Sequence, residues 1–216
     1  MSDSTLSLPF EHLNLRRNPF GERELSERRS LAILHEELSD LPDLRDPGFA
    51  LLILGDKGRG KTSHLLGLSA QHPDSVYLYI PEEGLRQLPS ELGPSPLFID
   101  EAQRLTRLQR RRLFDPTRSL VIGSHEDHER QLSKAGFRVL SRMASQGLDD
   151  SRLLAIFTRR IESVRRTDDD VPRLSLEACQ RLLHHFGDDV RAMEGYLYDV
   201  FQQLQGPCDV KLQDMD

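Results

Sequence analysis

The strongest chemical signal in the chain is a glycine-rich octapeptide. Residues 55–62 read Gly-Asp-Lys-Gly-Arg-Gly-Lys-Thr and fit the pattern G-x-x-x-x-G-K-[ST]. Glycines at this spacing let backbone N–H groups turn toward an anion, and a helix that begins at Lys61 adds its dipole. Lys61 is expected to reach the β- and γ-phosphates of a nucleotide, and Thr62 to ligate Mg²⁺. The predicted phosphate-binding set is Gly55, Asp56, Lys57, Gly58, Arg59, Gly60, Lys61, Thr62 and Ser63.

Two adjacent acids follow an apolar segment later in the chain. Asp100 and Glu101 come directly after residues 97–99, and the carboxyl end of a parallel strand is where ligands of such sheets bind. We expect Asp100 to help hold Mg²⁺ and Glu101 to activate a water for attack on the γ-phosphate. The alternative is that these acids cap the next helix, and that the glycine-rich segment is an accidental turn. The two motifs together favour hydrolysis of a nucleotide.

Two further polar residues are candidates for phosphate contacts. Ser124 follows the apolar residues 120–122 and could hydrogen-bond the γ-phosphate or the attacking water. His125 is a rival for that role, and a helix cap is the structural alternative. Arg191 stands in the first turn of another predicted helix, where a cation is unfavourable against the helix dipole. This position suggests a contact with a phosphate, with a surface pair to Asp188 as the alternative.

The segments that must position these residues alternate between strands and helices. Near-continuous apolar runs predict strands at 49–54, 76–80, 97–99, 120–122 and 137–140. Helical patterns accompany them at 24–41, 61–71, 82–92, 103–114 and 125–135, and three more follow at 151–166, 175–186 and 188–205. Buried strands separated by helices indicate a parallel sheet covered on both faces. The predicted fold class is therefore α/β, with a phosphate-binding core and a small helical lid.

The same pattern predicts four parts along the chain. We expect an N-terminal segment and helix that pack on the core, the core itself, a helical lid and a flexible tail, at 1–48, 49–150, 151–206 and 207–216.

Composition limits the classes of protein to consider. The 216 residues carry a net charge of −6, which argues against general binding of polyanions. No stretch approaches the roughly 18 apolar residues needed to cross a bilayer, and the N-terminus lacks the features of a signal peptide. Cys179 and Cys208 give neither a disulfide framework nor metal-ligand spacing, and the histidines show no zinc pattern. We therefore predict a cytoplasmic protein without membrane insertion.

The order of the motifs resembles an AAA+ ATPase module. The resemblance covers residues from about 14 to 205 and rests on Asn18-Pro19-Phe20, the loop at 55–62, Asp100-Glu101 and Gly187-Asp188-x-x-Arg191. In layout the chain is similar to small bacterial ATPases of transposition and secretion-associated systems. The resemblance implies a five-stranded parallel sheet of order 5-1-4-3-2, a helical lid, ATP bound between core and lid, and homo-oligomeric rings or filaments. It also implies sensor roles for Ser124 and Arg191, with Pro19 and Phe20 near adenine.

Arginines leave two questions open. The resemblance implies an arginine that completes a neighbour's site, and Arg142, Arg159 and Arg160 are the candidates. In the predicted helix 103–114, Arg104, Arg107 and Arg111 are expected to share one face. Such a stripe could bind phosphate backbones, but a solvated or intersubunit face is favoured, as is weak or absent nucleic-acid binding by the isolated protein.

The leading functional prediction is an ATP-dependent molecular switch or motor subunit, with ATP and Mg²⁺ as cofactors, that acts on a protein or nucleoprotein partner. A nucleotide-gated adaptor with little hydrolysis is the alternative from a different class. A small-molecule kinase is a third reading, and the C-terminal helical lid and the Asp100-Glu101 pair argue against it.

Overall fold

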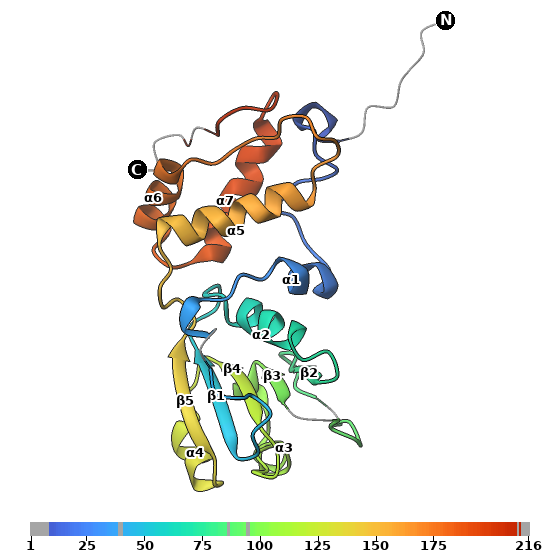
Figure 1. The fold of residues 1–216 in the computed structure, drawn as a ribbon, viewed down its shortest axis with the longest axis vertical. Coiled ribbons are helices and arrows are strands. Elements are labelled where there is room, and N and C mark those ends of the chain that lie inside the picture. Colours follow the sequence, from blue (N-terminus) through green and yellow to red (C-terminus); the bar gives the residue numbers. More distant parts are fainter. Residues whose placement is uncertain (1–8, 39–40, 86, 94–95, 211, 213–216) are drawn as a thin grey trace, which may run out of the picture. The chain divides into compact units, whose positions relative to one another are not determined.

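The computed structural model describes residues 9–38, 41–85, 87–93, 96–210 and 212 (Figure 1). The chain forms two compact units. The core unit comprises residues 25–147, and the helical unit comprises residues 1–24 and 148–216. Each unit has its own hydrophobic core, and each is described by itself below.

The core unit contains a five-stranded parallel sheet, which confirms the predicted α/β class. Its strands are β1 (Phe49–Leu54), β2 (Val76–Tyr79), β3 (Leu97–Asp100), β4 (Leu120–Ser124) and β5 (Arg138–Met143). The strand order is β2-β3-β4-β1-β5, which is the expected order 5-1-4-3-2 read from the opposite edge. All four pairings are parallel, so the carboxyl ends of the strands meet at one edge of the sheet.

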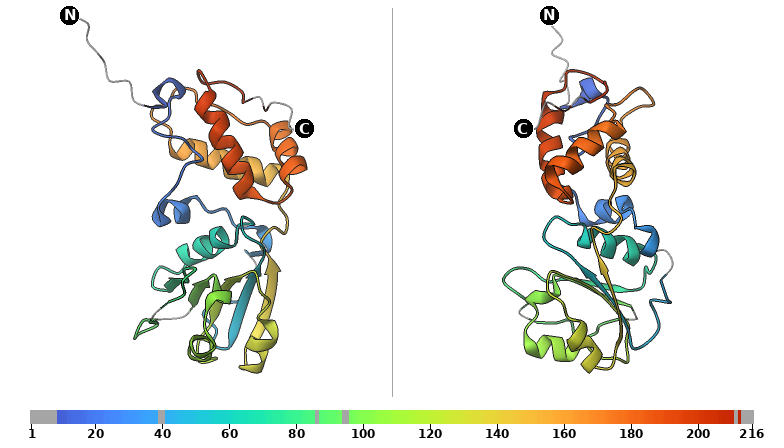
Figure 2. Two further views of the ribbon diagram at one scale, coloured as in Figure 1. Left: turned by 180° about the vertical axis from the view of Figure 1, so that it is seen from behind. Right: turned by 90° about the vertical axis from the view of Figure 1, so that its left-hand side faces the viewer.

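Both faces of this sheet are covered, because successive strand residues point to opposite sides. Leu51 and Ile53 pack in one buried cluster with Leu65 of helix α2 (Lys61–Ala70). Their neighbours Ala50 and Leu52 belong to a second cluster, on the side of α3 (Arg107–Leu113) and α4 (Glu129–Lys134). Figure 2 shows the core unit from two further sides. The result is a three-layer arrangement, with helices packed on both faces of the sheet.

Four helices predicted in the core unit differ from the structure. Of the predicted helix 125–135, only Glu129–Lys134 forms α4. The predicted helix 24–41 ends early: α1 spans Leu25–Leu31, and a short 3₁₀ turn follows at Glu36–Leu38. Between them Ala32 and Leu34 lie against Gly67 of α2, where a side chain on Gly67 would meet Leu34 at 2.8 Å. Because Gly67 has no side chain, Ala32 and Leu34 can pack closely against α2. This packing outweighs the helical propensity that the apolar periodicity of the segment indicates. Among the described residues of 82–92 no helix forms.

The predicted helix 103–114 is two elements. A 3₁₀ turn covers Ala102–Arg104, Leu105 is extended, and α3 begins at Arg107. Thr106 caps α3 through two reciprocal hydrogen bonds with Gln109. The Gln109 N–H donates to the Thr106 hydroxyl oxygen, and the Thr106 N–H donates to the side-chain oxygen of Gln109. This capping box starts a new helix at this point.

The helical unit is built on α5 (Asp150–Ser163), α6 (Leu176–Phe186) and α7 (Val190–Gln203). The N-terminal segment belongs here and not to the core unit, because Leu13, Leu15 and Phe20 are buried in the core of the helical unit. A 3₁₀ turn covers Glu11–Leu13. Val210 and Leu212 are buried in the same cluster, so these two residues do not form the free tail that was predicted. Within the described part of the chain, no helix is both long and apolar enough to span a bilayer.

Gly147, the last residue of the core unit, provides a stability prediction. Its φ is 64°, and a Cβ there would lie 1.8 Å from Nε2 of His35. Gly147→Ala should therefore carry the left-handed backbone cost of roughly 1–2 kcal/mol, plus about 1–3 kcal/mol for displacing the His35 ring. Thermal unfolding measures the sum. Gly84→Ala is the matched control, since Gly84 has a φ of 75° and open space around the Cβ position. Equal shifts in Tm for the two variants would contradict the steric part.

Candidate nucleotide site

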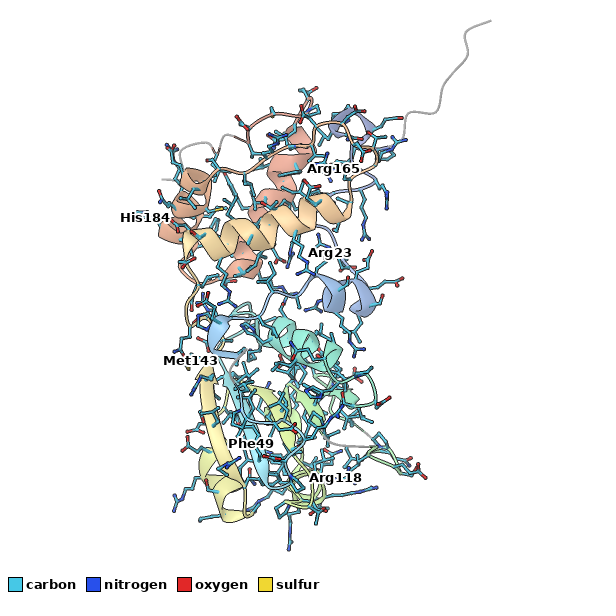
Figure 3. The ribbon with its side chains drawn as sticks, in the orientation of Figure 1. Arg23, Phe49, Arg118, Met143, Arg165 and His184 are labelled. Carbon is cyan, nitrogen blue, oxygen red and sulfur yellow. The ribbon has the colours of Figure 1, made fainter. Side chains whose placement is uncertain are left out.

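The glycine-rich loop lies at the carboxyl edge of the sheet, between β1 and α2. In Figure 3 the labelled Met143 marks this edge and Phe49 the opposite one. Gly58 and Gly60 have φ values of 90° and 89°, which only glycine adopts without strain. Gly60 is the N-cap of α2 and has no side chain to accept from the first N–H groups of the helix. Those donors therefore lack a side-chain cap, and an anion at this positive end of the helix could accept from them.

Lys61 is folded back onto this loop. Its ammonium group donates to the carbonyl oxygens of Gly55 and Asp56, both at 2.8 Å, and the residue is 5 % exposed. Burial lowers the pKa of Lys61, and the charges of Glu101, Asp100 and Asp56 oppose that shift. The Lys61 ammonium group is thus held over the loop by two carbonyl oxygens. The oxygens of a bound anion could replace these two partners.

Asp100 is the most enclosed charged residue of the site, at 0 % exposed. Its Oδ2 accepts from the Thr62 hydroxyl at 2.7 Å and from the Tyr77 hydroxyl at 2.8 Å. Its Oδ1 accepts from the backbone N–H of Glu101 at 3.1 Å. Gly123 opposite Asp100 makes room for this carboxyl, because a Cβ there would come within 3.0 Å of Oδ1.

Burial raises the pKa of Asp100, and the hydrogen bonds from Thr62 and Tyr77 oppose the rise. Burial beside this carboxyl also raises the pKa of Tyr77, so the phenol stays protonated and donates. Asp100 and Thr62 were expected to lie together, and the structure brings them together. Tyr77 was missed, and the signal for it was only its place in the neighbouring strand β2.

Glu101 has an unusual backbone conformation. Its φ of 63° and ψ of 42° are left-handed, a conformation that costs a non-glycine residue of order 1–3 kcal/mol and that clusters at functional sites. The conformation turns the chain out of β3 directly after Asp100. The Glu101 carboxylate, 18 % exposed, accepts from Gln103 Nε2 at 2.5 Å and pairs with Arg104 at 3.4 Å. Neither partner was predicted from the sequence.

Ser124 ends β4 beside the glycine-rich loop. Its carbonyl oxygen accepts from the Gly55 N–H at 3.3 Å. Its hydroxyl lies 3.1 Å from both Gln103 Oε1 and His128 Nε2, and it accepts from the Glu126 N–H at 3.0 Å. Ser124 is fully buried, whereas its predicted rival His125 is exposed. Of the two, only Ser124 belongs to the cluster.

His128 is a buried histidine in this network and was not singled out by the sequence. It is 3 % exposed and its ring meets Phe114 edge-on at 6.2 Å. Burial lowers the pKa of His128, and the charge of Arg110 acts in the same direction, while Glu126 and Asp127 act against it. Between this lowered pKa and the ordinary value of about 6.5, the unfolded chain binds more protons here than the folded protein.

The His128 environment therefore predicts a loss of stability in mild acid. The free energy of unfolding should fall as the pH falls from about 7.5 to 5.5, because protonation favours the unfolded chain in this window. His128→Gln should make that fall shallower, measured by urea denaturation at each pH. Gln131→Met, at an exposed neutral residue of α4, is the control and should leave the pH dependence as it is. A slope unchanged in His128→Gln would contradict the assignment.

The residues predicted for the adenine and sensor roles outside the core lie in the helical unit. Pro19 and Phe20 are buried, and the Phe20 ring packs edge-on against Phe157 and Phe201 at 5.4 and 5.1 Å. The Phe20 side chain thus has a structural role in the helical core. Arg191 is exposed in the first turn of α7. A contact of any of these residues with a nucleotide stays a prediction.

Most of the arginines near α3 hold loops in place. Arg104 donates to Ile80 O at 2.9 Å, and Arg110 to Gln103 O at 2.9 Å. Arg112 and Arg118 likewise donate to carbonyl oxygens of residues 89, 90 and 93. Because Arg104 lies before α3, it does not continue a stripe on that helix as predicted. These contacts favour the structural reading of the basic segment over a nucleic-acid surface.

The candidates for a residue acting on a neighbouring subunit have local contacts as well. Arg142 in β5 donates to its neighbouring carbonyl oxygen, that of Ser141, at 3.0 Å. Arg160 forms a short ion pair with Glu194 within the helical unit. Arg159 is exposed on α5. The choice between them stays open.

The donor set suits Mg²⁺ only together with phosphate. Within the described residues, no group of three or more His, Cys, Asp or Glu side chains is arranged to hold a metal ion. Mg²⁺ commonly takes one or two protein ligands and completes its shell with water and substrate phosphates. The Thr62 hydroxyl and the Asp100 carboxylate fit that pattern. No protein-family model matches the chain, and no curated protein matches it significantly, so the functional argument rests on the site itself.

Proposed function

We propose that this protein binds ATP with Mg²⁺ on the loop 55–62 and hydrolyses it, in the manner of an AAA+ ATPase. The observation that carries the proposal is the meeting of three strand ends. The glycine-rich loop follows β1, Asp100 and Glu101 follow β3, and Ser124 ends β4. The Thr62–Asp100 hydrogen bond of 2.7 Å joins the first two groups, and the Gly55–Ser124 hydrogen bond of 3.3 Å joins the first and third.

The loop supplies what a triphosphate requires. Two left-handed glycines and an uncapped helix start offer backbone N–H donors, and Lys61 offers a charge held within 2.8 Å of two loop carbonyl oxygens. Phosphate oxygens would replace those carbonyl oxygens as partners of the ammonium group. Thr62 and Asp100 would hold Mg²⁺, which when bound neutralises charge on the phosphates.

Glu101 is the residue proposed to act on the water, and Ser124 supports it through Gln103. The Glu101 carboxylate follows the buried Asp100 and is partly exposed, so it can accept a proton from a water that attacks the γ-phosphate. Ser124 is held by four partners at the end of the neighbouring strand, where its oxygen is fixed beside the loop. Fixed polar groups cost no reorganisation during the reaction.

We further propose that hydrolysis drives a conformational switch. The helical unit joins the core unit at residues 24–25 and 147–148, and relative motion of such units is a common response to a bound nucleotide. The partner that responds is a second copy of the chain or another protein, and the overall acidity disfavours general nucleic-acid binding.

A nucleotide-gated adaptor is the second candidate, and one observation favours it. Glu101 is paired with Arg104 in this structure, and a carboxylate held by a cation is a poor base. Such a protein would bind ATP, change its contacts and release the nucleotide without much turnover.

The test is to add ATP and Mg²⁺ to the full-length protein and to measure binding by calorimetry and phosphate release by a coupled assay. Binding that needs Mg²⁺ and is followed by phosphate release supports the ATPase. Binding without release supports the adaptor. Absence of binding would overturn both. Affinity capture with Glu101→Gln plus ATP, followed by mass spectrometry, then identifies the partner.

A further inference from the structure

Four side chains from three elements form one continuous chain of hydrogen bonds at the carboxyl edge of the sheet. His128 Nε2 lies 3.1 Å from Ser124 Oγ, and Ser124 Oγ lies 3.1 Å from Gln103 Oε1. Gln103 Nε2 lies 2.5 Å from a carboxylate oxygen of Glu101. Ser124 and His128 are buried, and Gln103 and Glu101 are partly buried. Gln103 is the link that joins the serine to the acid.

The chemistry of the four groups gives this chain one direction. An ionised Glu101 carboxylate can only accept, so the side-chain amide of Gln103 must donate to it. The other end of the Gln103 amide is then a carbonyl oxygen, which requires the single proton of the Ser124 hydroxyl. With that proton committed, His128 Nε2 must itself carry a proton and donate to Ser124. Every donor in the chain thus points toward Glu101.

The backbone around Gln103 strengthens this arrangement. Arg110 donates to the carbonyl oxygen of Gln103 at 2.9 Å, and the 3₁₀ turn Ala102–Arg104 holds the residue next to Glu101. The Ser124 oxygen also accepts from the Glu126 N–H at 3.0 Å. Ser124 therefore has one donated and two accepted hydrogen bonds, so its hydroxyl has no remaining freedom to turn.

We propose that Gln103 is a positioning residue that holds the Glu101 carboxylate through a directional hydrogen-bond chain, His128 to Ser124 to Gln103 to Glu101. This inference rests on the proposed function for its consequence in catalysis, but the chain itself is a property of the nucleotide-free protein. Gln103 fixes two groups at once: the base that would activate water and the serine beside the glycine-rich loop. Loss of Gln103 should disturb both.

The tautomer of His128 tests the hydrogen-bond chain in the absence of nucleotide. ¹⁵N NMR of the wild-type imidazole at about pH 7.5, above the ordinary histidine pKa, should show the proton on Nε2. In Gln103→Met, which keeps the side-chain length but cannot accept strongly, the Ser124 proton should turn to His128. The imidazole proton should then move to Nδ1. A wild-type proton on Nδ1, or an unchanged tautomer in Gln103→Met, would overturn the chain.

Gln103→Glu separates the two halves of the chain. A carboxylate at position 103 still accepts from Ser124, so the Nε2 proton of His128 should remain. It cannot donate to Glu101 and instead repels it, so the positioning of the acid should be lost. Should Gln103→Met fail to fold, this variant still decides the question, because a shift of the His128 proton to Nδ1 in Gln103→Glu would contradict the proposed direction.

Turnover measures the consequence for the acid. Gln103→Met and Gln103→Glu should each lower kcat for ATP by about 10–100-fold, as is typical when a group that orients a functional residue is lost, with KM changed less than about threefold. Gln131→Met, at an exposed glutamine of α4, is the control and should keep wild-type kcat. Unchanged kcat in both position-103 variants would overturn the positioning role. Absence of turnover in the wild type would instead contradict the proposed ATPase. The NMR result would then decide by itself whether the hydrogen-bond chain from His128 to Glu101 exists.

Discussion

Lys61→Ala is expected to weaken binding of ATP·Mg by roughly 100-fold. Lys61 is buried over the loop and makes two 2.8 Å hydrogen bonds to its carbonyl oxygens, so its ammonium group is already placed where phosphates would sit. A charge-assisted hydrogen bond contributes about 1.5–3 kcal/mol, and each 1.4 kcal/mol is about tenfold in affinity. Titration calorimetry with ATP and Mg²⁺ measures the change.

The control for this experiment is Lys134→Ala, which removes the same charge from the exposed last turn of α4. It should alter the affinity for ATP less than about twofold, since a solvated distant charge is screened. Circular dichroism would check that Lys61→Ala folds. A folded Lys61→Ala protein that binds ATP as tightly as the wild type would refute the nucleotide site at residues 55–62.

Glu101→Gln is expected to reduce ATP turnover by about 10²–10⁴-fold, the usual contribution of a general base. The substitution keeps the shape of the side chain and removes its ability to take a proton. Nucleotide affinity should change less than about threefold, because the phosphate contacts come from the loop and Lys61. Phosphate release at saturating ATP, together with the dissociation constant, separates the two effects.

Glu83→Gln, at an exposed acid of the core unit, is the matched control for loss of a carboxylate and should keep wild-type turnover. Two results would change the interpretation. Equal and negligible turnover in wild type and Glu101→Gln, with binding retained, would favour the adaptor. Equal and substantial turnover would mean that another group accepts the proton, and Glu101 would then be only a partner of Arg104 and Gln103.

The sequence determined the local parts of the site. The motif at residues 55–62 is contiguous, and its glycines adopt the positive φ values that such a loop needs. Apolar runs of strand length placed β1, β3 and β4 with their polar residues at the carboxyl ends. Because carboxyl ends of parallel strands share an edge, Thr62 and Asp100 could be expected to meet, and they lie within a 2.7 Å hydrogen bond. Short-range patterns sufficed for these features.

The tertiary structure decided what depends on contacts between distant segments. Ala32 and Leu34 leave the predicted helix because they pack against Gly67, and a periodic pattern cannot reveal which helix lacks a side chain opposite it. Leu13, Leu15 and Phe20 join the helical unit, although their place in the chain suggested the core. Helical periodicity also did not predict the break at Leu105, where the capping box of Thr106 competes with continuation of the helix.

The partners of the candidate catalytic acid also emerged only from the fold. Gln103 and Arg104 are close to Glu101 in sequence, but their roles depend on the left-handed turn at Glu101 and on contacts with β2 and β4. Tyr77 and His128 reach the site from two other elements. A sequence can identify residues able to bind phosphate or accept a proton. Which neutral side chains hold them in place is set by three-dimensional packing, because many polar residues could serve and only the sheet order and the turns select among them.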